Sequence, residues 1–90
     1  MAIIKFTSAL KRFYPTLGDT EIEVENVSEV IEELEKTYPG INNYLIDETG
    51  ALRKHVNIFV DGSLIEDRAE LSDALVKGSE VFIMQALSGG

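Results

Sequence analysis

Ninety residues with 44% hydrophobic content suit one small globular domain, because two ordinary cores need a longer chain. The absence of cysteine excludes disulfide staples, thiolate metal sites and a nucleophilic thiol. Eight basic and 16 acidic residues give a net charge of −8, which argues against nucleic-acid binding because phosphate contacts need clustered lysine and arginine. No apolar run has membrane-spanning length and the first residues lack a signal-peptide pattern, so we expect a cytoplasmic protein without a membrane partner.

The first quarter of the chain predicts an antiparallel hairpin. Apolar and polar side chains alternate over residues 2–7, which is typical of a strand with one buried face. Residues 20–25 alternate more cleanly, with Ile22 and Val24 facing inward between outward glutamates. The residues between the two strands carry turn signals, among them Pro15. We therefore expect a hairpin with a fairly long loop.

The period then changes to that of a helix. Apolar residues recur at helical spacing from Val27 to Leu34, and Tyr38 follows one turn later. Ser28 is the expected N-cap, and glutamates near the start suit the positive end of the helix dipole. Pro39-Gly40 should end the helix. The pattern predicts a helix of roughly ten residues with one apolar face.

A short second helical turn and a β-hairpin are predicted next. Residues 41–46 favour the helical turn. Residues 56–60 predict a strand whose apolar side chains at alternate positions share one face. Asp61-Gly62 has the composition of a tight turn, and residues 64–65 should continue as a short edge strand.

The last third ends in a strand. Residues 71–76 favour a short helix or 3₁₀ turn closed by Gly78. Residues 80–85 predict the last strand, with Val81 and Ile83 facing inward.

These elements predict an α+β fold in which a mixed four- to five-stranded sheet packs on one main helix. The order strand-strand-helix-strand-strand matches the β-grasp, or ubiquitin-like, arrangement. We expect the two strands that flank the helix to be parallel neighbours joined by a right-handed crossover. The domain should span residues 1–85, and residues 86–90 should form a flexible C-terminal tail ending in Gly-Gly.

Two segments resemble a known family. Residues 80–90 (EVFIMQALSGG) resemble the end of the MoaD/ThiS family of ubiquitin-like sulfur carriers, which close with a strand, a short extended tail and Gly-Gly. Residues 55–62 (HVNIFVDG) resemble the third-strand segment of that family, in the branch that includes CysO, the carrier used in cysteine synthesis. Residues 85–86 are Gln-Ala, where many molybdopterin-type carriers have two prolines. The resemblance implies a carrier protein that is not itself an enzyme.

The resemblance also implies which atoms react. A ubiquitin-activating-like adenylyltransferase of the MoeB/ThiF type, using ATP-Mg, adenylates the Gly90 carboxylate, and a sulfur donor converts it to a thiocarboxylate. The chain itself is then expected to bind no cofactor or metal. Leu87, Ser88 and Gly89 complete the tail, and glycines without a Cβ suit a narrow channel. Five extended residues can reach roughly 16–18 Å at about 3.3–3.6 Å each.

The partners and alternatives follow from the same resemblance. The implied sulfur acceptor is a molybdopterin synthase large subunit or a cysteine synthase-like enzyme, serving molybdenum cofactor or cysteine synthesis, and the free carrier is expected to be a monomer. One alternative is a ubiquitin-like modifier joined through Gly90 to lysines of other proteins. Another is a non-covalent β-grasp binding module whose Gly-Gly end is incidental.

A docking surface is predicted on the sheet face that turns away from the helix. Alternation places Phe59, Phe82 and Met84 on that face, which should be polar if nothing binds there. We expect these side chains to dock both the activating enzyme and the sulfur acceptor; the alternative is that loops or sheet curl cover them. The positive run at residues 53–55 either contacts an acidic partner or is a solvated loop.

Overall fold

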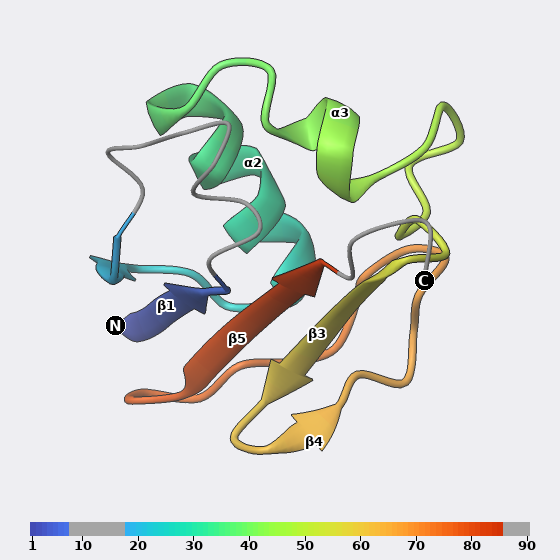
Figure 1. Cartoon of the computed structure of the whole chain (residues 1–90). Helices are drawn as coiled ribbons and strands as arrows, with labels where there is room; N and C mark the ends of the chain where they lie inside the picture. Colours follow the sequence, from blue (N-terminus) through green and yellow to red (C-terminus); the bar gives the residue numbers. More distant parts are fainter. Residues whose placement is uncertain (8–17, 86–90) are drawn as a thin grey trace.

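A five-stranded mixed sheet with the order β2-β1-β5-β3-β4 carries one main helix on one face (Figure 1). The computed structural model describes residues 1–7 and 18–85. Within these ranges no helix is long and apolar enough to cross a bilayer. The strands are β1 (Ala2–Phe6), β2 (Thr20–Ile22), β3 (Val56–Val60), β4 (Ser63–Leu64) and β5 (Glu80–Gln85), and the described helices are α2 (Val27–Thr37) and α3 (Asn42–Leu45).

The sheet topology confirms the β-grasp prediction and corrects one detail of it. β1 pairs antiparallel with β2 and parallel with β5, while β5 pairs antiparallel with β3. The strands that flank the helix, β2 and β3, are therefore not neighbours, because β1 and β5 lie between them. β2 is a short edge strand whose Glu21 is exposed, which suits the rim of a sheet better than its centre.

The core lies between the sheet and α2. Ala2, Ile4 and Phe6 alternate inward from β1, as their spacing predicts. The buried face of α2 consists of the apolar residues that the helical period identified, namely Val27, Val30, Ile31 and Leu34. The same cluster includes side chains from β3, β5 and α3, namely Val56, Ile58, Val81, Ile83 and Leu45.

The start of α2 differs from the prediction that Ser28 caps it. Asn26 is the N-cap: its backbone is extended, and its side-chain oxygen accepts a hydrogen bond of 2.9 Å from the Glu29 backbone N–H. Glu29 reaches back and accepts from the Glu25 N–H at 2.6 Å. The backbone N–H of Ser28 instead donates to the Leu71 carbonyl. Ser28 therefore lies inside the helix, two positions after the residue that caps it.

The segment after β4 corrects the prediction of a helix or 3₁₀ turn at residues 71–76. It passes the N-terminus of α2 without regular secondary structure, and Ala74 forms an isolated bridge with Asn26. The carbonyls of Leu71 and Asp73 accept from the first N–H groups of α2, which have no partners inside the helix. Leu71 and Leu75 are both buried, so their helix-like spacing reflects two separate core contacts of an irregular segment.

The β3–β4 hairpin is a two-residue turn, as predicted. Asp61 and Gly62 both have positive φ, 50° and 88°, which is the conformation of a type I′ turn. The turn sets Val60 opposite Ser63 and Phe59 opposite Leu64. This register decides which side chains share the outer face of the sheet.

Candidate functional site

The predicted tail lies outside the described residues; it comprises Leu87, Ser88, Gly89 and Gly90. The prediction that residues 86–90 are flexible concerns the same part of the chain, which the structure does not describe. What the structure describes is the residue from which the tail leaves, Gln85 at the end of β5.

Three neighbouring elements hold Gln85. It pairs with Val56 at the start of β3. Its backbone N–H donates to the Thr7 hydroxyl and its side-chain Nε2 to the Tyr44 carbonyl, both at 3.5 Å. The strand that leads into the tail is thus fixed to the body of the domain up to residue 85.

The three apolar residues of the predicted docking surface lie together on the outer face. Phe59 of β3 is the cross-strand partner of Phe82 on β5, and Met84 lies two residues further along β5 opposite Asn57. All three side chains are half-buried, while their strand neighbours Ile58 and Ile83 are fully buried on the inner face. The structure therefore places them on one surface, away from α2.

Leu64 extends this surface, and sequence reasoning missed it. Leu64 stands opposite Phe59 across the β3–β4 hairpin and is 56% exposed. We call Phe59, Leu64, Phe82 and Met84 the sheet-face patch. The signal was available: a two-residue turn at Asp61-Gly62 fixes the register, and that register puts Leu64 on the same face as Phe59.

A charged pair borders the patch on the β1 side. Lys5 of β1 lies beside Phe82, and its Nζ is 3.5 Å from a carboxylate oxygen of Glu80. Asn57 lies beside Met84 on the other side. The patch thus has an apolar centre and a polar rim, which is the composition of a protein-docking surface.

Arg68 fastens the start of β3, next to the strand that carries the tail. Its guanidinium donates to the carbonyls of Arg53 and Val56 at 2.7 and 2.9 Å, and to Asn57 Oδ1 at 3.2 Å. Arg53, Lys54 and His55, the predicted positive run, are exposed in the loop just before β3. Arg68 carried no motif in the sequence, so only the fold reveals its position.

Two aspartates shape loops rather than a reactive centre. Hydrogen bonds from the Thr49 hydroxyl and backbone lower the pKa of Asp47, with a further contribution from the charge of Arg53. The pKa of Asp67 is lowered first by the backbone N–H of Glu70 and then by the Ser72 hydroxyl. Over the ranges that the structure describes, no three histidine or acidic side chains gather in a way that could hold a metal ion.

Comparison with known proteins decides the family. Residues 4–90 match the model of the ThiS family. Sulfur carrier protein CysO of Mycobacterium tuberculosis (strain ATCC 25618 / H37Rv) is 34% identical over 68 residues, which cover 73% of each chain. The chain belongs to the ThiS family. This confirms the resemblance to the ubiquitin-like sulfur carriers that the C-terminal segment and residues 55–62 indicated.

Solved structures show the same fold over nearly the whole chain. The crystal structure of M. tuberculosis CysO gives a TM-score of 0.81 at 25% identity, covering 97% of this ThiS-family chain and 100% of that one. A chain of the Amycolatopsis orientalis BexX/CysO complex gives 0.84 at 21% identity and covers both chains completely. The small archaeal modifier protein 1 (SAMP1) of Methanosarcina acetivorans gives 0.75 at 26% identity, covering 99% of this chain and 95% of that one.

Proposed function

We propose that this ThiS-family protein is a sulfur carrier that works through a thiocarboxylate on Gly90. The observation that carries the proposal is the family match, which continues through residue 90 and so includes the Gly-Gly motif. The relative with 34% identity is named a sulfur carrier protein. The proposal makes Gly90 the carboxyl end of the working protein and makes the chain a carrier rather than an enzyme.

The chemistry needs two steps on one carboxylate. The carboxylate oxygen attacks the α-phosphorus of ATP, which forms an acyl-adenylate and releases pyrophosphate. A sulfide-level donor then attacks the acyl carbon, a C–S bond forms, and AMP leaves with the oxygen it received. The adenylyltransferase supplies ATP-Mg and the charged groups at the phosphates, so the chain contributes only the acyl group.

The body of the domain supplies the recognition. A partner that covers the sheet-face patch would seat on the face that carries β5, the strand that leads to the tail. Because Gln85 is held by Thr7, β3 and α3, the seated body would aim the tail in a defined direction. Five residues beyond Gln85 then reach roughly 16–18 Å into the partner.

Adenylation can be tested before any sulfur chemistry. A ThiF- or MoeB-type enzyme should catalyse exchange of labelled pyrophosphate into ATP only when the full chain is present. The matched control is the same chain without Gly90, which keeps every described residue and removes the proposed acceptor. Equal exchange with both chains would contradict the proposal.

The acceptor is proposed to be a cysteine synthase-like enzyme. The CysO likeness supports this over a molybdopterin synthase large subunit, as does Gln-Ala at residues 85–86 where molybdopterin-type carriers have two prolines. Incubating the thiocarboxylated chain with each enzyme and its substrate should yield product only with the cysteine synthase-like enzyme. Product only with the molybdopterin synthase subunit would reassign the pathway and leave the carrier proposal intact.

A second candidate function is protein modification through the same Gly90 acyl group. The likeness to SAMP1 of M. acetivorans, a protein named a modifier, favours it. Tryptic digests of cells expressing the chain would then show branched remnants on lysines of other proteins that depend on Gly90. Their absence, together with absence of adenylation, would instead favour the non-covalent binding module.

A further inference from the structure

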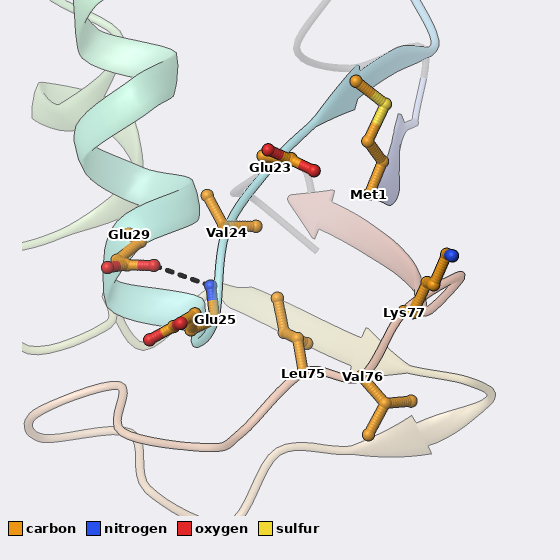
Figure 2. Close-up of a pocket in the computed structure, with 8 residues that line it drawn as sticks. All are labelled: Met1, Glu23, Val24, Glu25, Glu29, Leu75, Val76 and Lys77. Atoms are coloured by element: carbon orange, nitrogen blue, oxygen red, sulfur yellow. Dashed lines mark hydrogen bonds between the residues drawn. The ribbon is translucent and has the colours of Figure 1, made fainter.

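An open groove of about 750 Å³ lies at the end of the domain where β5 begins (Figure 2). One wall is the segment from Glu23 to Glu25 that joins β2 to α2, with the first turn of α2, and the other is the segment from Leu75 to Lys77. Met1 closes one side. The proposed carrier chemistry uses none of these residues.

The groove has a fixed frame. The Leu75 N–H donates to the Glu25 carbonyl at 2.9 Å, and the Gly78 N–H donates to the Met1 carbonyl at 2.9 Å. The Glu25 N–H donates to Glu29 Oε1, which ties the wall to the helix start (Figure 2). Because backbone hydrogen bonds join the two walls, the groove is preformed. Binding a ligand there would therefore cost little conformational entropy of the protein.

Aliphatic side chains line part of this groove. The side chain of Leu75 is buried and points toward the half-buried Val24 (Figure 2). Met1 is 55% exposed and lies at the edge of the groove. The 70% exposed side chain of Val76 points away from Val24 (Figure 2).

Charge sets the chemistry of the partner. Glu23, Glu25 and Glu29 lie along the β2 and α2 side of the groove, and Lys77 lies on the opposite side at the approach to β5 (Figure 2). The four side chains sum to two negative charges, three acidic against one basic. A complementary ligand therefore carries positive charge beside aliphatic side chains.

We propose that this groove is a second docking site, which binds an extended basic segment of a partner protein in which lysine or arginine alternates with aliphatic residues. The aliphatic side chains of the segment contact Val24 and Met1, and its cationic groups face the glutamates. β5 begins beside the groove and ends at Gln85, so the groove is separated from the root of the tail by about 17 Å of strand. A partner held here leaves the tail and its chemistry free.

The probe is the blocked hexapeptide acetyl-Ala-Leu-Lys-Val-Arg-Ala-amide, titrated into the isotope-labelled full chain and followed by ¹H–¹⁵N NMR. Shift changes should concentrate on residues 23–25, Glu29 and residues 75–77. Replacing Glu23 and Glu25 by Gln should weaken binding about fivefold, since each exposed charge pair contributes modestly. A peptide with Ser at both aliphatic positions should bind more weakly as well.

The matched control is Glu32→Gln with Glu48→Gln, which removes the same charge at two exposed positions outside the groove. This pair should change the affinity less than twofold. Equal weakening by both pairs, shift changes scattered over the acidic surface, or no binding would each overturn the proposal. Adenylation of Gly90 is measured separately, so failure of the carrier proposal would leave the NMR result unchanged.

Discussion

Single side chains fix the start of α2 and the surface of the sheet. Asn26 caps the helix, and the Glu29 carboxylate accepts from the backbone N–H of Glu25. The carbonyls of residues 71 and 73 accept from the first two N–H groups of α2, at residues 28 and 27. Sequence reasoning selected Ser28 as the cap; serine and asparagine are equally good caps, and Asn26 stands only two positions earlier. The choice between them depends on where the chain leaves β2, which is tertiary information.

Asn26→Ala should lower the free energy of unfolding by about 1 kcal/mol, because the Glu29 N–H then loses its acceptor. Urea unfolding followed by circular dichroism measures the change. Ser28→Ala is the matched control and should change the free energy by less than about 0.5 kcal/mol. The reverse order of the two effects would show that Ser28 is the cap.

Phe82→Ala should lower kcat/KM for adenylation at least tenfold, because a half-buried aromatic at the centre of a docking surface contributes about 1.4 kcal/mol or more. Pyrophosphate exchange at varied carrier concentration measures it, with circular dichroism to verify folding. Val76→Ala, which truncates an apolar side chain outside the sheet-face patch, is the control and should have little effect. Wild-type kinetics for folded Phe82→Ala would show that the patch does not dock the activating enzyme.

At the scale of elements, β1, β3, β5 and α2 follow from periodicity alone, whereas only Thr20–Ile22 of the strand predicted at residues 20–25 forms β2. β3 and β5 were predicted with the bounds that the structure shows. In both, apolar and polar residues alternate and turn residues mark an end of the run, which leaves few alternative positions for the ends of the strand. The segment after β4 could not be predicted in this way. Leu71 adopts a positive φ of 59° there, which nothing in its own sequence favours and which burial of its side chain stabilises.

The loop at residues 67–72 should make stability depend on pH. The Asp67 carboxylate accepts hydrogen bonds from Glu70, Ser72 and Ala69, and these lower its pKa, with Glu70 contributing most. A pKa lowered in the folded state adds stability above the unfolded value of about 3.9, and that stability is lost as the pH falls through the folded value.

Asp67→Asn should therefore lower the urea midpoint at pH 7, and its deficit relative to the wild type should shrink as the pH falls below about 4. Glu70→Gln removes a charge from the same loop but leaves these acceptors in place, so it serves as the control. A deficit that stays constant from neutral to acidic pH would exclude the Asp67 carboxylate as its source.

At the scale of the whole molecule, the sheet-face patch and the acidic groove both lie along β5. β5 carries Phe82 and Met84 of the sheet-face patch, starts beside the acidic groove and ends at the root of the tail. The fold class and the position of the patch could be predicted, because alternation and element order determine them. The groove could not, because it joins Met1, residues 23–25 and residues 75–77, which only the tertiary fold brings together.

The central claim is that sulfur is carried on the Gly90 carboxylate. The most direct measurement is the intact mass of the full chain after incubation with a ThiF- or MoeB-type adenylyltransferase, ATP-Mg and sulfide. The account predicts the mass increase that accompanies replacement of one oxygen by sulfur, located by fragmentation to Gly90 and absent from the chain that lacks it. An unchanged mass under conditions in which the same enzyme thiocarboxylates an established ThiS-family carrier, or a sulfur located anywhere other than Gly90, would contradict it.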